Sequence, residues 1–487
     1  MTDNKSSYKS IFKATSLFGG VEIYQILILV IKSKIIAVLL GTVGVGILGL
    51  FQSAQLLVKQ ITSVGLSQSA VRDVAEVYSA GNSNNINRTL AVLRILVWIT
   101  GIIGFVIFFI VSPVLSDITF GNYSYTLSFA LLSITLLFDQ LCAGRIVILQ
   151  GFRHLREMAK VTVYGATLGL LFSIPIYYYW GINGIVPTLI IHSFALLFVA
   201  YYFTRGIGNT NLKLPHKIVF SQGANMLKMG MAMTISGVIT ALISYIIRWY
   251  IRVEGGLEEV GLYQAGFAII NVYVGMIFTA IGKDYYPRLS AINNDNLKCK
   301  ELVSQQGEIA ILIMAPMLMA CLLLMPYLIL LLYSEKFVPA NEFIEWACLG
   351  MMFRLLSWLI SYQLVAKAES RLFVINEIIS GLYSIVLYLL GYYWGGLKGL
   401  GITFLIGYFI YFVQLYFVVH KKYNFVFSSE FIKIFLIETL LVFITLLIVS
   451  YSRSFIFIAV IVSLIGFLYS LYNLNKRICL LRIKSKK

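Results

Sequence analysis

The sequence predicts an all-α polytopic membrane protein with about fourteen transmembrane helices, arranged as two pseudo-symmetric six-helix lobes and a C-terminal helix pair. Three observations support this fold class: the composition, the length of the apolar runs and an internal repeat. Of the 487 residues, 59% are hydrophobic and 12% charged, whereas soluble domains carry roughly 45–50% apolar and about 25% charged residues. The chain is therefore suited to a hydrocarbon environment.

Apolar runs of about 20 residues, the length that crosses a bilayer, recur along the whole chain. They separate into candidate spans with short polar connections. The first and seventh candidates are long and carry charges, which indicates tilted or broken helices. The predicted spans are 11–40, 43–66, 89–112, 125–148, 158–180, 183–204, 223–252, 260–282, 303–332, 343–366, 371–393, 399–420, 431–451 and 454–474.

The distribution of Lys and Arg predicts that both termini are cytoplasmic. With the N-terminus inside, 27 of the 38 Lys and Arg residues fall in or at the edge of cytoplasmic segments. Outside loops hold only Arg252, Lys336, Lys398 and Arg453, and the remaining seven lie within spans. This bias follows the positive-inside rule. The first apolar stretch has no A-x-A cleavage signal, so we interpret it as a retained helix rather than a signal peptide.

The sequence resembles itself at an offset of about 212–215 residues. Leu48-Gly-Leu-Phe-Gln-Ser-Ala54 aligns with Val260-Gly-Leu-Tyr-Gln-Ala-Gly266, and Tyr177-Tyr-Tyr-Trp-Gly-Ile-Asn-Gly184 aligns with Gly391-Tyr-Tyr-Trp-Gly-Gly-Leu-Lys-Gly399. Six spans per copy is an even number, so both copies enter the membrane in one direction, as in transporters whose two lobes rock around a shared cavity. The predicted domains are an N-lobe (1–210), a C-lobe (211–425) and C-terminal spans 13–14 with a basic tail (426–487).

The net charge of +17 does not indicate a nucleic-acid-binding protein. Nucleic-acid binding needs basic residues on one solvated face or in a motif, and here they form short clusters between apolar runs. Anionic membrane lipids and a cationic cavity explain them better. The five cysteines form no CxxC pair and the four histidines are far apart. We therefore predict no disulfide framework, metal site or cofactor.

No enzymatic motif is supported. Gly44-Val-Gly-Ile-Leu-Gly49 matches GxGxxG, but a dinucleotide site also needs a βαβ unit, and this match lies at a junction between two membrane helices. There is no GxxxxGK[ST] phosphate loop either. We predict that the protein is not an enzyme.

Charged residues within spans are the most informative positions. Each costs about 2.5–3.5 kcal/mol at a helix centre on insertion scales, so it should face water, a partner or a ligand. Those near predicted cytoplasmic ends fit snorkelling or local pairing, Glu438 fits a structural role, and Asp139 fits either structural pairing or ion and proton coupling. The charged positions are Glu22, Lys32, Lys34, Lys59, Arg94, Asp139, Arg145, Arg248, Arg354, Glu377 and Glu438.

Lys32, Lys34 and Arg248 form the predicted core of a substrate site. An offset of 214 relates Lys34 to Arg248, so the first helix of each lobe carries a cation at the same depth. Pseudo-symmetry would direct both helices toward a central cavity. Guanidinium and ammonium groups bind phosphate strongly, so such a cavity suits a pyrophosphate or an acidic sugar. The alternative is that these cations snorkel to outer headgroups.

Several short motifs resemble the polysaccharide exporters of the multidrug/oligosaccharidyl-lipid/polysaccharide superfamily. In the first lobe they are Leu40-Gly-x-x-Gly-x-Gly-Ile-Leu-Gly49 and Gly65-Leu-Ser-Gln-Ser-Ala-Val-Arg72. In the second they are Glu259-Val-Gly-Leu-Tyr-Gln264, Tyr286-Pro-Arg-Leu-Ser290, Ser334-Glu-Lys-Phe337 and Val365-Ala-Lys-Ala-Glu-Ser-Arg-Leu-Phe373. Their order along residues 10–422 is similar to the Wzx-type branch of O-antigen and related lipid-linked oligosaccharide flippases.

The resemblance implies a MATE-like, two-lobed transporter of the bacterial inner membrane. It would move undecaprenyl-diphosphate-linked oligosaccharides of lipopolysaccharide or another surface polysaccharide from the cytoplasmic to the periplasmic face by alternating access. It implies intracavity charges at Glu22, Lys32, Lys34, Lys59 and Arg248. Polymerase and chain-length proteins of the same pathway are its candidate partners. Spans 13–14 depart from the shorter members of this branch.

Three other functions fit the sequence less well. A drug/cation antiporter of the same superfamily would need a cavity dominated by carboxylates, and the intramembrane charges are mainly cations. A membrane polymerase or ligase would need a sizeable extracytoplasmic loop, and the outside loops are short. A purely structural protein would leave the charges within spans unexplained.

Overall fold

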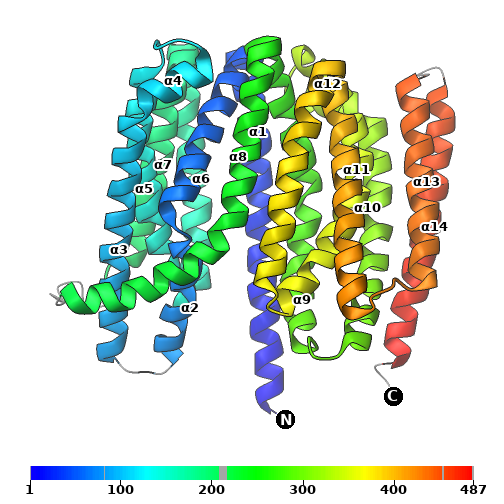
Figure 1. Ribbon diagram of the computed structural model, residues 1–487, viewed down its shortest axis with the longest axis horizontal. Coiled ribbons are helices and arrows are strands. Elements are labelled where there is room, and N and C mark those ends of the chain that lie inside the picture. Colours follow the sequence, from blue (N-terminus) through cyan, green and yellow to red (C-terminus); the bar gives the residue numbers. More distant parts are fainter. Residues whose placement is uncertain (1, 80, 82, 208–215, 452–454, 485–487) are drawn as a thin grey trace. The chain divides into compact units, whose positions relative to one another are not determined.

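The described chain is built from helices and contains no strand. A computed structural model describes the backbone of residues 2–79, 81, 83–207, 216–451 and 455–484 (Figure 1). Within these residues, ten helical segments are long and apolar enough to cross a membrane. Four of the ten contain an internal break and so supply two spans each, which gives fourteen. The predicted fold class is confirmed.

The chain forms two compact units, and the boundary between them lies between Val253 and Glu254. Helices α1 to α7 and most of α8 belong to the first unit. The helices of this part are α1 (Thr2–Ser63), α2 (Leu66–Ser79), α3 (Ser83–Ile110), α4 (Ser112–Phe120), α5 (Thr126–Gly151), α6 (Leu155–Trp180), the 3-10 turn η1 (Gly181–Gly184), α7 (Ile185–Thr204) and α8 (His216–Ala268).

The second unit begins in the last turns of α8 and includes the remaining helices. A short π-helical segment interrupts its first span. The elements are η2 (Ile269–Val274), α9 (Met276–Ala291), α10 (Asn296–Leu332), η3 (Glu335–Ala340), α11 (Asn341–Ala366), α12 (Ser370–Tyr423), α13 (Ser429–Tyr451) and α14 (Ile456–Lys484).

Glycines make the breaks inside the long helices, and they do so in matching pairs. Gly41 in α1 has φ 67° and ψ −169°, and Gly256 in α8 has φ 84° and ψ −178°. Gly181 after α6 has φ 51° and ψ −129°, and Gly396 in α12 has φ 55° and ψ −137°. Side chains disfavour positive φ, so glycine is the residue suited to these positions. The members of each pair lie 215 residues apart, so the repeat is also present in the backbone.

Two residues other than glycine give the same spacing. Arg153 and Ala368 have φ values of 56° and 58° and are also 215 residues apart. In each case the following residue, His154 or Glu369, donates its backbone N–H to the carbonyl five residues earlier, at 2.8 and 2.9 Å. These bonds close the ends of α5 and α11 in one way. Equivalent loops in the two copies therefore share their conformation.

Glu369 also ties the α11–α12 loop to the far end of α12. Its carboxylate pairs with Lys422 and accepts a hydrogen bond from the Tyr423 hydroxyl at 3.1 Å. The hydrogen bond from Lys422 is the main reason that the pKa of this carboxyl lies below its ordinary value.

The first part of α8 packs along the first unit at both of its ends. A Cβ placed on Gly65 would lie 2.3 Å from the carbonyl oxygen of Gly230, so the two backbones touch there. Near the other end, the Tyr245 hydroxyl bonds to that of Thr119 on α4 at 2.7 Å. These contacts explain why span 7 clusters with the first unit. The predicted lobe boundary at 210/211, which rests on the repeat, stays a prediction.

Cysteine labelling checks the predicted orientation. In a cysteine-free background, a cysteine at Asn122 or Glu254 should react with an impermeant thiol reagent in intact spheroplasts, because the positive-inside rule puts both outside. Glu254 is preferable to Gly256, where φ of 84° would strain a cysteine. A cysteine at Asn84 or Asn294 should react only after permeabilisation. The reverse pattern of labelling would refute the orientation.

Candidate functional site

A polar ladder joins the second half of α1 to α5 inside the first unit. Gln55 donates to the Thr135 hydroxyl at 2.6 Å, and one turn further Lys59 forms an ion pair with Asp139 at 2.9 Å. Both partners advance by four residues, so the two helix segments run parallel. The Lys59 and Asp139 side chains are 39% and 20% exposed. The structure thus brings together one predicted substrate-binding cation and the predicted coupling carboxylate.

The pair gives Asp139 a structural role in the conformation described. An isolated carboxylate in a span is costly, and a neighbouring ammonium group is a direct way to stabilise it. The contact also neutralises the charge that Lys59 would offer to an anion. Coupling by Asp139 would require this ion pair to open.

Lys32 lies near a histidine that sequence reasoning did not single out. The charges of Lys32 and Asp139 both act on the His192 imidazole of α7. This ring packs against α6 so closely that a Cβ on Gly169 would lie 2.0 Å from its Nδ1 atom. Nδ1 is buried and has no hydrogen-bond partner among the described residues. The interior of the first unit therefore holds a polar group of four titratable side chains, from α1, α5 and α7.

Arg248 is buried on the first part of α8, with 4% of its surface exposed. Its Nη1 atom donates to the Ser244 carbonyl at 2.8 Å and to the Ser244 hydroxyl. The turn of α8 that precedes Arg248 therefore orients the guanidinium. A buried guanidinium that is held in place is suited to bidentate recognition of an anion.

The glycine breaks refine the relation between Arg248 and the lysines. Arg248 lies eight residues before Gly256, and Ser33 lies eight residues before Gly41. The repeat therefore relates Arg248 to Ser33, with Lys32 and Lys34 on either side, rather than relating it to Lys34. One residue turns a helical side chain by about 100°, so the two cations do not point in equivalent directions. Lys34 is half-buried, and the side chain of Glu22 lies outside the described part.

A second intramembrane cation, in the other unit, is more fully surrounded. Arg354 on α11 donates to Asn271, and its guanidinium lies over the rings of Phe278 and Tyr408 at 5.5 and 5.3 Å. Asn271 belongs to the π-helical segment η2. π-Helical turns are often found at functional sites. The sequence marked Arg354 as an intramembrane charge, but only the fold shows its amide and aromatic surroundings.

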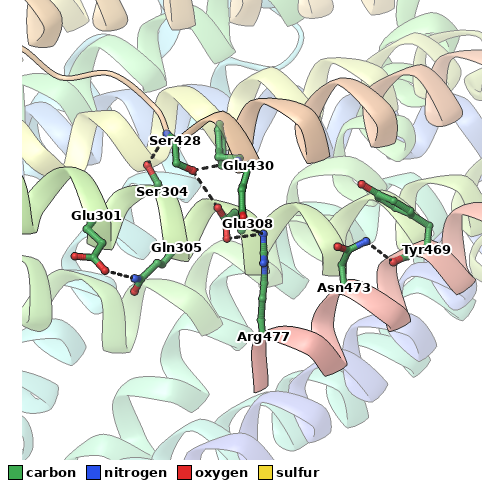
Figure 2. A network of polar contacts seen from close by, with 10 residues as sticks. Glu301, Ser304, Gln305, Glu308, Ser428, Glu430, Tyr469, Asn473 and Arg477 are labelled. Carbon is green, nitrogen blue, oxygen red and sulfur yellow. Dashed lines mark hydrogen bonds and ion pairs between the residues drawn. The ribbon is translucent and has the colours of Figure 1, made fainter. Parts of the chain in front are cut away.

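Within the second unit, a charge network joins the two C-terminal helices to α10 (Figure 2). Arg477 of α14 pairs with Glu308 of α10 at 2.9 Å and with Glu430 of α13 at 3.4 Å. The Ser428 hydroxyl accepts the N–H of Phe431 at 3.0 Å and donates to Glu308 at 3.1 Å, so it caps α13 and links it to α10. Predicted spans 13 and 14, which are α13 and α14, are thereby held against α10, which contains predicted span 9.

Glu438 joins these two C-terminal helices to each other. Its carboxylate is fully buried and accepts a hydrogen bond from Ser470 of α14. This contact favours the structural role that the sequence predicted for it.

Two of these titratable residues could have been found in the sequence. His192 lies in the middle of predicted span 6, and Glu308 lies within predicted span 9. Each is a polar residue in an apolar run, which is the signal that identified the other intramembrane charges. Their partners come from distant segments. Among the described side chains, no group of three His, Cys, Asp or Glu could hold a metal.

Comparison with solved structures defines the fold. An inward-facing multidrug resistance MATE family transporter of the MOP superfamily matches 83% of this chain and 98% of its own, with a TM-score of 0.69 and 16% identity. The lipid II flippase MurJ in an inward closed conformation matches 96% of this chain and 100% of its own, with a TM-score of 0.68 and 13% identity. The protein therefore has the fold of the MOP superfamily transporters.

The sequence comparisons define the family. The model of a polysaccharide biosynthesis protein family matches residues 82–342, more than half of the chain. The chain belongs to this family. It is also similar to the lipid III flippases of Escherichia coli K12 and Shigella flexneri, each 21% identical over 71% of this chain and 82% of the relative. The predicted resemblance to polysaccharide exporters is confirmed at this level.

A double-mutant cycle tests the Lys59–Asp139 pair. Asp139→Asn and Lys59→Met should each lower the thermal midpoint of the purified protein, because each leaves one charge in the membrane without its partner. The double variant should be less destabilised than the two single effects predict, with a coupling energy of about 1 kcal/mol or more. Additive effects would show that the pair contributes nothing to stability.

A second prediction concerns the anchor of spans 13 and 14. Arg477→Gln should destabilise the protein by about 3 kcal/mol, because it leaves Glu308, whose side chain is 9% exposed, without its charge partner. Adding Glu308→Gln should recover part of the loss. Lys476→Gln, at the exposed neighbouring position, is the matched control. Equal thermal midpoints for Arg477→Gln and Lys476→Gln would refute the role of the network.

Proposed function

We propose that this protein is a flippase of the bacterial inner membrane. It moves an undecaprenyl-diphosphate-linked oligosaccharide, an O-antigen-type repeat unit of a surface polysaccharide, from the cytoplasmic to the periplasmic leaflet by alternating access of its two lobes. Membership of the polysaccharide biosynthesis family supports the pathway. The similarity to lipid III flippases supports the kind of cargo.

One observation carries the substrate class: positive charge exceeds negative charge inside the spans of the first unit. Among the charges predicted to face the cavity or to couple transport, Lys32, Lys34, Lys59 and Arg248 are positive, and Glu22 and Asp139 are negative. Whatever pairs form, two positive charges remain in excess. A diphosphate is the anion that matches them, because guanidinium and ammonium groups make strong charge-assisted hydrogen bonds to phosphate oxygens.

The residues divide this task according to their surroundings. Arg248 is buried and oriented by Ser244, so its guanidinium charge has a fixed position from which to attract a phosphate. Lys32 and Lys34 flank the equivalent position in the first span and supply further positive charge. Lys59 is paired with Asp139 and becomes available only when that pair opens, which would tie substrate binding to a change in the ladder between α1 and α5.

A drug/cation antiporter remains the second candidate because several solved relatives in fold are multidrug transporters. An antiporter for cationic drugs needs negative charge along its path. The charge balance within the spans is the reverse. Drug resistance conferred by the wild-type protein, without rescue of polysaccharide export, would favour this candidate.

Substitution of Arg248 tests the proposal. In a strain that lacks its flippase, Arg248→Ala should abolish export of surface polysaccharide while the protein still inserts, because loss of a charge makes partition into the membrane easier. Arg248→Lys should keep part of the activity, since it retains the charge but loses the planar fork. The measurement is surface polysaccharide per unit of membrane-localised protein.

Substitutions of the two lysines and of a neighbouring arginine are compared with Arg248→Ala in the same export assay. Loss of Lys34 alone should be milder than loss of Lys32 and Lys34 together. Arg252→Ala, one turn nearer the Gly256 break, is the matched control and should retain export. Wild-type export by Arg248→Ala at equal abundance would eliminate the site. A defect that merely follows lost protein would assign Arg248 a structural role.

A further inference from the structure

A pocket of about 420 Å³ opens on the surface of the first unit, between α3, α5 and α7. This volume is within the range of ~300–1,000 Å³ usual for ligand pockets. Its walls are mainly apolar, and Trp98, Phe194 and Phe198 line it although each is more than half exposed. Exposed aromatic side chains on a membrane span are suited to contact with lipid chains.

Two arginines line the same pocket, which we call the α3/α5/α7 groove. Arg94 comes from α3 and Arg145 from α5, and their positive charges act on each other. The Arg145 guanidinium lies over the Tyr201 ring at 4.7 Å and donates to the Thr204 hydroxyl at 3.4 Å. Arg94 donates to the Ile207 carbonyl at 3.1 Å. Both guanidiniums are thus held at one end of an apolar groove.

No carboxylate balances these two charges within the described part of the chain. The ion pairs found there involve other cations, such as Lys59 and Arg477. The Arg94 Nε atom is buried and has no hydrogen-bond partner among the described residues. Two adjacent cations that lack a counter-ion in a membrane span are unfavourable. A bound anion would therefore stabilise this pair of arginines.

We propose that the α3/α5/α7 groove binds an anionic phospholipid, with its phosphate between Arg94 and Arg145 and an acyl chain along the aromatic walls. Charge complementarity identifies the headgroup, because paired guanidiniums match phosphate oxygens. The apolar walls identify the rest of the ligand as a lipid chain. Both arginines lie toward the ends of their spans that the positive-inside rule places in the cytoplasm, where basic pockets between helices bind anionic headgroups.

This site is separate from the proposed transport function. It uses none of the residues that would contact the oligosaccharide diphosphate. The groove lies on α3, α5 and α7, whereas Lys32, Lys34 and Arg248 lie on α1 and α8. A bound lipid would brace three helices of the first unit from outside.

Trp98 provides a reporter inside the groove. The full-length protein is placed in nanodiscs of phosphatidylcholine with a minor fraction of phosphatidylglycerol. Bromine is carried either by the phosphatidylglycerol chains or by an equal fraction of the phosphatidylcholine chains. The Trp98 signal is the part of the fluorescence that Trp98→Phe removes. Brominated phosphatidylglycerol should quench it several-fold more than brominated phosphatidylcholine does.

Charge removal should abolish this preference. Arg94→Gln and Arg145→Gln should each weaken phosphatidylglycerol binding by about tenfold, the usual effect of losing one charge-assisted phosphate contact. Arg145→Lys should fall between wild type and Arg145→Gln, because it keeps the charge and loses the fork. Arg371→Gln, an exposed arginine at the start of α12, is the matched control and should behave as wild type.

Two further experiments use the wild-type protein. High salt should reduce the preference of the wild-type protein for phosphatidylglycerol, since ions screen charge attraction. Unlabelled undecaprenyl phosphate, added at the same fraction, should not displace brominated phosphatidylglycerol. Its displacement would assign the groove to the prenyl-linked cargo instead. Equal quenching by both brominated lipids in the wild type, or a preference that persists in Arg94→Gln/Arg145→Gln, would overturn the proposal.

Discussion

The hydrocarbon core of the membrane imposes the constraint from which this structure follows. A backbone N–H or carbonyl that lacks a partner there costs several kcal/mol, so each span must satisfy its own hydrogen bonds as a helix. The chain can reverse only where a residue accepts a conformation outside the helix. Gly41, Gly181, Gly256 and Gly396 do this with positive φ, and their paired conformations repeat every 215 residues. The two copies of the repeat therefore have the same backbone conformation at these breaks.

The same constraint governs the charges. Inside the first unit, Lys59 and Asp139 form an ion pair on neighbouring parallel helices, and Arg248 is satisfied by its own preceding turn. In the second unit, Arg354 is held by an amide and two aromatic rings. Each arrangement lowers the penalty of burial in a different way. An ion pair must open before either partner can bind another ion, whereas the contacts of Arg248 and Arg354 with neutral groups leave their positive charges uncancelled by those groups.

Helix α8 connects the two units in an unexpected manner. Its first part packs on the first unit through Gly230 and Tyr245, and its last turns, beyond the break at Gly256, belong to the second unit. The repeat, in contrast, makes span 7 the first helix of the second copy. Span 7 thus belongs to the second copy by its sequence and to the first unit by its packing.

Composition, apolar run length and two matched sequence motifs determined the fold class, the fourteen spans and the repeat, because these depend on local hydrophobicity and local sequence. The sequence also identified Lys59, Asp139 and Arg354 as charges within spans, since a charge in an apolar run is visible without a structure. Tertiary structure alone decided their partners: Asp139 lies 80 residues from Lys59 and Asn271 lies 83 residues from Arg354. It also decided the register that relates Arg248 to Ser33, because a repeat aligned by short apolar matches tolerates a shift of one residue, whereas a glycine break does not.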